Sequence, residues 1–432
     1  MRKNLVLGII ASLIGVTACN SGSNITNINE IQSNQISSFS SRNTLLRQQS
    51  NFRLEAEAGE ILVALKTGRM RASIDRINSK YGTKIDDSIP SLDTVLLKID
   101  NKAKTNDIIK SLLKDPDVEV AGPNYKVWTM LDVNDPMVND QYALKLVEAK
   151  KAWDITQGRA ETVIAIVDTG IDLTHPDLKD KLVPGFSALK DKENDHNQKE
   201  GGDDNGHGTH CAGIAAGIGN NGLGIAGIAL KNKIMPVRVL GGAGSGSLFS
   251  IAKGIDWATD NGASVISMSL GGPSSAMDLI IERAVNKALK KNIPVVAAMG
   301  NSGKEEKSVP ACIKGVIAVG ATDSNDRKAP FSTFGSHISV TAPGVQILST
   351  MPTYDVFITK EYGVSKNYAA LSGTSMATPV VSGIVGLIRA KYPSLTPAQI
   401  KERLEKSSDD LGQSGFDKLY GHGRVNAYKA LL

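Results

Sequence analysis

The fold is decided by the stretch Ser372-Gly373-Thr374-Ser375-Met376-Ala377-Thr378-Pro379, in which small residues lead directly into an apolar run. This run predicts a helix over residues 377–389 that is apolar on nearly all sides and is therefore buried. The start of such a helix presents N–H groups without partners and the positive end of the helix dipole. Ser375 is therefore a candidate nucleophile at the floor of a cleft.

A serine in a turn of small residues is common, so its possible partners decide the interpretation. An α/β-hydrolase would place its acid and its histidine after the serine, but the only histidine beyond Ser375 is His422. Upstream, Asp168 ends an apolar run and His207 opens an Ala/Gly-rich helix. These side chains can divide one reaction: Ser375 attacks, His207 takes and returns the proton, and Asp168 fixes the imidazole tautomer.

A zinc site at His207 and His210 is the alternative interpretation of this segment. A spacing of three residues allows two ligands on one helix. No further cluster of histidine and cysteine supplies the remaining ligands of a closed site. We therefore favour the acid–base role for His207.

Alternating strands and helices are predicted beyond Trp153. Five apolar runs read as buried strands, at residues 163–167, 234–240, 265–270, 294–299 and 316–319. Helical segments separate several of them, which indicates an α/β fold with a doubly wound, mostly parallel sheet. Ligands of such sheets bind at the carboxyl ends of the strands, where Asp168 lies.

A smaller α+β module at residues 55–130 is expected before the large domain at residues 131–432. Strands are predicted at residues 60–65, 94–99 and 118–120, and helices at residues 70–81 and 108–113. Two helices on one face of a small antiparallel sheet give a ferredoxin-like arrangement.

The N-terminus has the features of an export signal. In residues 1–19, two basic residues precede an apolar run that is too short to span a bilayer. The run ends in Val16-Thr17-Ala18-Cys19, which resembles a bacterial lipobox and implies a lipid anchor on Cys19. An ordinary cleavage site with an incidental cysteine is the alternative. Residues 20–54 are rich in serine and asparagine and indicate a flexible tether. We expect an exported protein, anchored to a membrane or extracellular after maturation.

Composition argues for a globular protein and against nucleic-acid binding. Of the 432 residues, 41% are hydrophobic and 22% are charged, and the formal net charge is +5. This charge is small for the length and no basic run stands out, so no nucleic-acid partner is expected.

Three blocks of sequence resemble those of a known family. They are Asp168-Thr169-Gly170-Ile171-Asp172, His207-Gly208-Thr209-His210-Cys211-Ala212-Gly213 and Gly373-Thr374-Ser375-Met376-Ala377-Thr378-Pro379. In this order they resemble the signature blocks of the subtilases, the subtilisin-like serine proteases. The resemblance covers about residues 132–432, and the module before it is similar to the inhibitory prodomain of these enzymes.

The resemblance implies a serine endopeptidase that cleaves protein or peptide substrates through an acyl-enzyme. It also implies a zymogen that is inhibited by its own prodomain and processes itself between about Tyr125 and Asp135. The alternative function is that of a catalytically silent subtilase that serves as a surface binding module.

The resemblance also assigns substrate-binding positions. Asn301 and the backbone N–H of Ser375 would hold the oxyanion of the tetrahedral intermediate. Two backbone segments would flank an extended substrate peptide as additional strands: Gly244, Ser245 and Gly246 on one side, and Ser269, Leu270 and Gly271 on the other. Ala298 and Gly300 would face Leu270 and Gly271 across a roomy apolar S1 pocket.

A structural calcium ion is also implied by the resemblance. Asp177, Asn221 and the carbonyl groups near Leu223 and Ile225 would bind it, and such hard oxygen ligands suit calcium. The loop departs from the usual length in the family. Val380 is a second departure, since it stands where the family usually has histidine.

Cys211 and Cys312 could form a disulfide, and the sequence leaves their pairing open. Cys211 lies four residues after His207, on the same face of the predicted helix. The resemblance suggests that Cys211 is a free thiol beneath the histidine. A buried thiol in apolar surroundings behaves as a small hydrophobic side chain, so we do not expect a nucleophile there.

Overall fold

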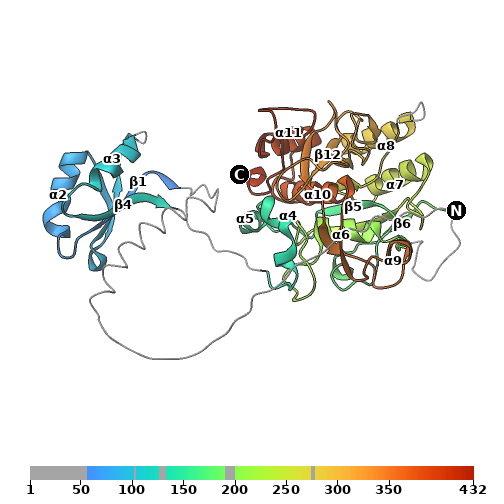
Figure 1. The fold of residues 1–432 in the computed structure, drawn as a ribbon, viewed down its shortest axis with the longest axis horizontal. Coiled ribbons are helices and arrows are strands. Elements are labelled where there is room, and N and C mark those ends of the chain that lie inside the picture. Colours follow the sequence, from blue (N-terminus) through green and yellow to red (C-terminus); the bar gives the residue numbers. More distant parts are fainter. Residues whose placement is uncertain (1–55, 102–103, 126–132, 190–199, 274–277) are drawn as a thin grey trace, which may run out of the picture. The chain divides into compact units, whose positions relative to one another are not determined.

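The computed structural model describes residues 56–101, 104–125, 133–189, 200–273 and 278–432 (Figure 1). The chain divides into two compact units, Met1–Val127 and Trp128–Leu432. The predicted signal peptide, Cys19 and the predicted tether lie outside the described residues.

The N-terminal unit is built on a four-stranded antiparallel sheet with the order β2-β3-β1-β4. Its elements are β1 (Ala56–Leu65), α2 (Met70–Tyr81), β2 (Lys84–Ile89), β3 (Thr94–Lys98), α3 (Thr105–Leu112) and β4 (Val118–Tyr125). Alternate residues of β1, Ile61 and Val63, are buried together with Ile77 of α2 and Leu112 of α3. The α+β prediction is thus confirmed. The sequence analysis missed β2, because its residues are mostly exposed and show no apolar run.

The C-terminal unit contains a seven-stranded sheet with the order β13-β12-β10-β8-β5-β7-β6, in which all pairs are parallel. Its strands are β5 (Val163–Asp168), β6 (Phe186–Ser187), β7 (Lys233–Arg238), β8 (Val265–Met268), β10 (Val295–Ala298), β12 (Ile317–Thr322) and β13 (Val340–Pro343). Each of the five predicted apolar runs coincides with a strand of this sheet. The α/β prediction is therefore confirmed.

Helices cover both faces of this sheet. The helices of the unit are α4 (Tyr142–Leu146), α5 (Ala149–Ile155), α6 (His207–Ala216), α7 (Leu248–Asp260), α8 (Asp278–Lys290), α9 (Phe357–Tyr362), α10 (Thr374–Lys391) and α11 (Pro397–Ser407). Ile164 and Ile166 of β5 pack in one core with α6 and α10, whereas Ala165 and Val167 pack in a second core with α7 and α8. Both faces of β5 are buried, which explains why its sequence is continuously apolar.

Two short antiparallel pairs complete the unit. They are β9 (Gly272–Pro273) with β11 (Ser308–Val309), and β14 (Ile347–Thr350) with β15 (Tyr368–Leu371). The second pair matters most for the site, because β15 leads directly into α10.

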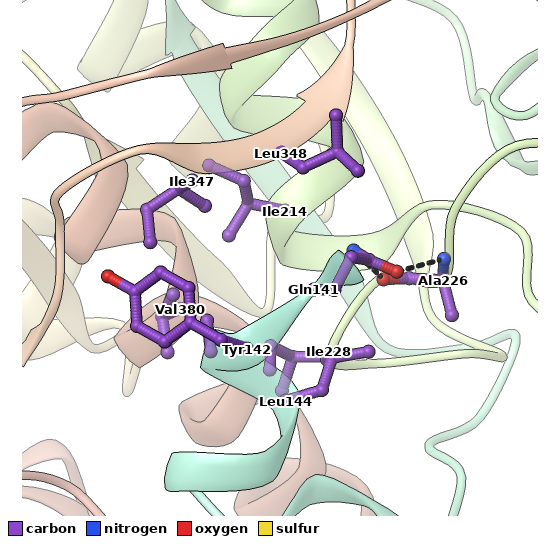
Figure 2. A pocket seen from close by; sticks show the side chains of 10 residues that line it. Gln141, Tyr142, Leu144, Ile214, Ala226, Ile228, Ile347, Leu348 and Val380 are labelled. Atoms are coloured by element: carbon purple, nitrogen blue, oxygen red, sulfur yellow. Dashed lines mark hydrogen bonds between the residues drawn. The ribbon is translucent and has the colours of Figure 1, made fainter. Parts of the chain in front are cut away.

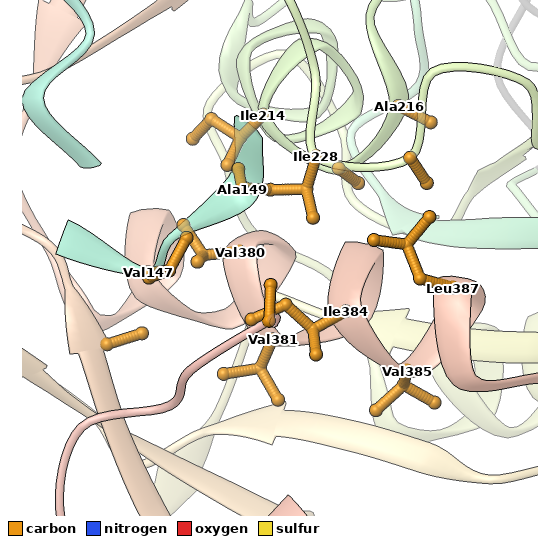
Figure 3. Close-up of a cluster of buried hydrophobic side chains, with 14 of the residues drawn as sticks. Val147, Ala149, Ile214, Ala216, Ile228, Val380, Val381, Ile384, Val385 and Leu387 are labelled. Carbon is orange, nitrogen blue, oxygen red and sulfur yellow. The ribbon is translucent and has the colours of Figure 1, made fainter. Parts of the chain in front are cut away.

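Helix α10 is buried on all sides, as predicted (Figure 3). It begins at Thr374, three residues before the predicted start, so that Ser375 belongs to its first turn. Gly383 allows close approach to neighbouring segments: a Cβ there would lie 2.5 Å from Cβ of Ile228 and 2.7 Å from the carbonyl oxygen of Ala215.

A small cavity lies beside Val380, among side chains from α4, α6, β14 and α10 (Figure 2). Its volume is about 10 Å³ and most of its lining is apolar. Gln141 at its edge is satisfied by two hydrogen bonds to the backbone of Ala226. A space of this size holds no more than about one water molecule. The cavity is therefore a packing gap and not a substrate site.

Candidate active site

Asp168 and His207 form a hydrogen-bonded pair at the carboxyl end of the sheet. Asp168 is the last residue of β5 and is fully buried, and His207 is the first residue of α6. Nδ1 of His207 lies 2.8 Å from Oδ1 of Asp168, and the His207 side chain is 22% exposed. Burial lowers the pKa of His207, but the charge and hydrogen bond of Asp168 and the adjacent Cys211 sulfur together raise it by more, so the pKa lies well above its usual value.

Asp203 fixes the segment that carries His207, and the sequence analysis missed it. One of its carboxylate oxygens accepts hydrogen bonds from the Thr169 hydroxyl and from the backbone N–H of Gly206, each at 2.9 Å. The other accepts from the N–H and the hydroxyl of Thr209. This one carboxylate thus joins the end of β5 to the start of α6. An acid just before a helix start is a capping signal that could have revealed it.

Ser375 lies in the first turn of α10, where N–H groups have no partner within the helix. Its hydroxyl donates to the carbonyl oxygen of Ser269 at 3.0 Å, and no hydrogen bond joins it to His207 among the described contacts. Hydrogen bonds of catalytic groups are often absent or long in free enzymes and form in the substrate complex. Rotation of the Ser375 side chain is needed for such a bond.

The carbonyl group of Ser375 is held by side chains because Pro379 cannot bind it. In a regular helix the N–H of residue 379 would donate to this carbonyl, and proline has no N–H. The Ser269 hydroxyl donates to it at 2.7 Å and the Cys211 thiol at 3.5 Å. Cys211 stands one turn after His207 on α6, so these contacts fix α10 against the helix of the histidine.

Asn301, the expected oxyanion residue, contacts the start of α10. Its Oδ1 accepts hydrogen bonds from the N–H (2.9 Å) and the hydroxyl (3.0 Å) of Thr374. Its Nδ2 lies beside Gly373, where an added Cβ would be 3.4 Å away. The amide N–H groups of Asn301 are therefore available next to the start of α10, close to the backbone N–H of Ser375.

The expected S1 residues come from neighbouring strands. Ser269, Leu270 and Gly271 follow β8, while Ala298 ends β10 and Gly300 lies just beyond it. The structure adds two hydroxyl groups to the expected apolar surroundings. A Cβ at Gly271 would lie 2.9 Å from Oγ of Ser308, and a Cβ at Gly300 would lie 3.1 Å from Oγ1 of Thr333.

The other expected substrate segment, Gly244, Ser245 and Gly246, lies in an exposed loop after β7. The loop is closed by a hydrogen bond from the N–H of Gly241 to the carbonyl of Ser245, at 2.9 Å. The side chain of Asn205, two residues before His207, donates to the carbonyl of Gly242 at 2.7 Å. This bond ties the loop to the segment of the histidine.

Comparison with known proteins identifies the family. A family model described as the subtilase family matches residues 159–423, which is more than half of the chain. The chain belongs to the subtilase family. A second model, described as the fervidolysin N-terminal prodomain, matches residues 46–124. The protein is therefore a subtilisin-like serine endopeptidase with an N-terminal prodomain.

Individual subtilases are similar over most of the chain. Thermitase from Thermoactinomyces vulgaris is 46% identical over 299 residues, which span 69% of this chain and 98% of thermitase. A thermophilic serine proteinase from Bacillus sp. (strain AK1) is 38% identical over 358 residues, 83% of this chain and 79% of that protein. The crystal structure of fervidolysin from Fervidobacterium pennivorans, a keratinolytic enzyme, matches with a TM-score of 0.60 and 28% identity, over 87% of this chain and 61% of fervidolysin.

Two of the expected calcium ligands of this subtilase, Asp177 and Asn221, contact each other, and Leu223 and Ile225 meet them through N–H groups and not through the expected carbonyl groups. The fully buried carboxylate of Asp177 accepts hydrogen bonds from the Asn221 side chain (2.8 Å) and from the N–H of Ile225 (3.1 Å). The N–H of Leu223 donates to Oδ1 of Asn221. Tyr368, which the sequence analysis missed, donates its hydroxyl to Asp177 at 2.8 Å.

A second buried carboxylate, Asp135, comes from the segment before α4, contacts the loop that contains Asn221 and was also missed. It accepts hydrogen bonds from the N–H groups of Asn220 (2.7 Å) and Asn221 (3.0 Å). Among the described residues, no ion pair joins Asp135 or Asp177 to a cationic side chain. The carboxylates of Asp135 and Asp177 and the side-chain oxygen of Asn221 are hard oxygen ligands of the kind that calcium prefers, so the chemistry of these residues fits a calcium ion.

Both cysteines among the described residues are free thiols, so the alternative of a disulfide is not realised. Cys211 is fully buried, and its sulfur lies 3.9 Å from Nδ1 of His207. Burial raises the pKa of this thiol, which suppresses the reactive thiolate. Nε2 of His210 lies 3.0 Å from the carbonyl oxygen of Ala369. Among the described residues, the side chains that lie close enough to His207 to share a metal ion with it are Asp168 and Cys211, and His210 is not one of them.

Proposed function

We propose that Asp168, His207 and Ser375 are the catalytic triad of a self-processing, exported endopeptidase. The observation that carries this proposal is the Asp168–His207 pair, held beside Ser375 by the contacts of Cys211 and Ser269 with the Ser375 carbonyl. An acid at the end of β5, a base at the start of α6 and a nucleophile at the start of α10 thus meet at one end of the sheet.

The mechanism follows from the donors and acceptors of these groups. Nε2 of His207 takes the proton of the Ser375 hydroxyl as its oxygen attacks the carbonyl carbon of the substrate. The N–H groups of Asn301 and Ser375 hold the oxyanion that forms. His207 then gives the proton to the leaving amine and activates the water that hydrolyses the acyl-enzyme. The negative Asp168 stabilises the imidazolium in both steps.

A fluorophosphonate probe tests the proposal. It should label the mature enzyme at Ser375, as shown by peptide mapping, and should fail to label Ser375→Ala. Ser372→Ala is the matched control, because the Ser372 hydroxyl accepts a hydrogen bond from Gln346 outside the triad. A folded wild type that the probe does not label would support the silent binding module instead.

The substrate should present a large apolar residue at P1. The side chains closest to Gly271 and Gly300 are the uncharged Ser308 and Thr333, so a basic P1 side chain would find no acid among them. A peptide-library profile measures this preference as kcat/KM. A profile led by lysine or arginine would contradict the prediction.

The N-terminal unit is proposed as the intramolecular inhibitor. Its sheet exposes apolar side chains on the face away from the helices: Leu62 is 42% exposed and Val120 is 56% exposed, and Leu62 pairs with Leu96. An apolar sheet face of this kind is suited to docking on another surface. The peptidase unit is the proposed partner of this sheet face.

Calcium is proposed to stabilise the loop around Asp177. A ligand present at 1,000 times its Kd contributes about 4 kcal/mol to unfolding free energy, which is roughly 10 °C in Tm for a domain of this size. Chelation should therefore lower Tm by about this amount. Asp177→Asn should lose the response to calcium, and Asp180→Asn, three residues away, should keep it. Equal Tm values with calcium and with chelator in the wild type would contradict this prediction.

A mercurial should inhibit by binding Cys211. The metal would stand between the thiol and Nδ1 of His207, 3.9 Å apart, and would displace the histidine from Asp168. Cys211→Ala should remain active and become insensitive to the mercurial, while Cys312→Ala should remain sensitive. Activity with one equivalent of mercurial measures the effect. A folded but inactive Cys211→Ala would show that the thiol has more than a steric role.

Export and lipid anchoring are proposed from the sequence of residues 1–19. None of the helices formed by the described residues has the length and apolar character that crossing a membrane requires. The lipobox-like ending at Cys19 supports a covalent lipid there. Incorporation of labelled palmitate by the wild type, and its loss in Cys19→Ser, checks the anchor.

A further inference from the structure

Tyr368 is enclosed by the segments that surround Asp177. Its hydroxyl donates to the Asp177 carboxylate at 2.8 Å, and its ring meets the ring of His175 edge-on, with centroids 5.4 Å apart. The ring also covers Gly224, where an added Cβ would lie only 2.2 Å from ring atoms. The side chain thus contacts both parts of the proposed calcium site, the Asp177 segment and the loop that contains Gly224.

The backbone on each side of Tyr368 is fixed by a buried histidine. Nδ1 of His175 accepts the N–H of Asp177, so its Nε2 carries the proton and donates to the carbonyl of Asn367 at 3.0 Å. On the other side, Nε2 of His210 donates to the carbonyl of Ala369 at 3.0 Å. Asn367, just before β15, and the first two residues of β15 are therefore held by side chains from the Asp177 segment and from α6.

β15 connects this anchored point to the nucleophile. The strand ends at Leu371, and only Ser372 and Gly373 separate it from α10. Its partner strand β14 is bound to α6: the hydroxyl groups of Ser349 and Thr350 donate to the carbonyl groups of His210 and Thr209, each at 2.8 Å. A shift of β15 would therefore change the position of Ser375 relative to the helix of His207.

We propose that Tyr368 is a positioning residue that couples calcium binding at Asp177 to the reactivity of Ser375. The inference rests on the calcium ion and the nucleophile of the proposed function. Calcium would fix the Asp177 carboxylate, Tyr368 would transmit this order to β15, and β15 would hold the first turn of α10. Loss of the hydroxyl separates the two sites and leaves the ligands and the triad in place.

The expected change in calcium affinity follows from the hydrogen bond of Tyr368 to Asp177, a proposed calcium ligand. Groups that hydrogen-bond a metal-binding carboxylate orient it, and their removal weakens metal affinity about 10- to 100-fold. If one residue carries the coupling between two sites, its loss also removes the response of the second site to ligand binding at the first. Tyr368→Phe should therefore weaken calcium binding and also abolish the effect of calcium on Ser375.

Two measurements without turnover test the coupling. Calorimetry on the full-length Ser375→Ala chain gives the calcium Kd without autolysis, and hydrogen exchange on the same chain reports the protection of β15. Adding Tyr368→Phe should raise the Kd about 10- to 100-fold and remove the calcium-dependent protection of residues 368–371. The exchange measurement remains informative if the variant does not mature.

A third measurement uses the active enzyme. Saturating calcium should accelerate fluorophosphonate labelling of the wild type at least about fivefold over the chelated enzyme, and this ratio should fall towards one in Tyr368→Phe. Tyr392→Phe is the matched control, because it loses a tyrosine hydrogen bond of 2.9 Å to the carbonyl of Leu431, far along α10. It should keep the wild-type Kd, protection and ratio.

The outcomes separate the inference from the function on which it rests. If Tyr368→Phe keeps the wild-type Kd, β15 protection and labelling ratio, the proposed coupling is wrong, and the proposed function is unaffected. Equal changes in Tyr368→Phe and Tyr392→Phe would also overturn the coupling, because they would indicate a general loss of stability. If the wild type is labelled but binds no calcium, the coupling is wrong because the proposed metal site does not exist. If the wild type binds calcium but is not labelled, the coupling is wrong because Ser375 is not a reactive nucleophile.

Discussion

Ser375→Ala should accumulate as the full-length zymogen, shortened only by removal of the signal peptide. The wild type should cleave itself between about Tyr125 and Asp135, a stretch that includes residues 126–132 outside the described part of the chain. The variant lacks the attacking oxygen, so it can neither form the acyl-enzyme nor release its prodomain. Peptidase activity should fall on the order of 10⁶-fold, the loss known for the nucleophile of a related enzyme. N-terminal sequencing of the purified chains gives the result.

Two controls distinguish self-processing from cleavage by another protease. Ser372→Ala should mature at the wild-type position, because the Ser372 hydroxyl accepts its hydrogen bonds from Gln346 within the described part of the chain. A trace of active wild type, added to purified Ser375→Ala, reveals whether cleavage can also occur between molecules. If purified Ser375→Ala matured unaided to the same N-terminus, self-processing by Ser375 would be wrong.

Asp168→Asn should lower kcat about 10⁴-fold while the protein remains folded. The amide has the shape of the carboxylate but lacks its charge, so it can favour the wrong tautomer of His207 and cannot stabilise the imidazolium. The Asp168–His207 contact of 2.8 Å is the basis of this expectation. Steady-state kinetics on the matured variant, obtained by adding wild-type enzyme in trans and removing it afterwards, measures the loss.

The pH profile provides an independent check on Asp168. His207 acts as a base only when neutral, so activity rises as pH rises through its pKa. Burial lowers this pKa, and the effects of Asp168 and Cys211 together raise it by more, so it lies well above the usual value. Removing the charge of Asp168 takes away the largest of the effects that raise the pKa, so the acidic limb of kcat/KM should move to lower pH in Asp168→Asn. Asp256→Asn, on the exposed surface of α7, should keep the wild-type limb; an unchanged limb in Asp168→Asn would contradict this account.

The central strands and the terminal positions of Asp168 and His207 could be predicted from sequence for physical reasons. β5 is buried on both faces, so it must be apolar at every position, and this pattern is visible without knowledge of its neighbours. The same burial explains α10. The family resemblance then added Asn301 and the expected calcium ligands, which no local pattern distinguishes.

Contacts between distant residues could not be predicted in this way. Tyr368 and Asp177 are 191 residues apart, and nothing near Tyr368 indicates a partner for its hydroxyl. The contact between Ser375 and Ser269 spans 106 residues and depends on the orientation of a single side chain. Strand β2 was missed for a different reason, because its polar residues lie on the edge of a sheet, where burial imposes no pattern.

Because Pro379 leaves the carbonyl group of Ser375 without a helical partner, the position of the nucleophile depends on contacts with distant parts of the chain. The two donors to this carbonyl group, Ser269 and Cys211, come from 106 and 164 residues earlier in the chain. α10 alone therefore does not bind this carbonyl group, and the shorter bond, from Ser269 at 2.7 Å, remains when Cys211 is replaced by alanine. We therefore expect a newly synthesised chain to lack peptidase activity until the end of β8 contacts the first turn of α10.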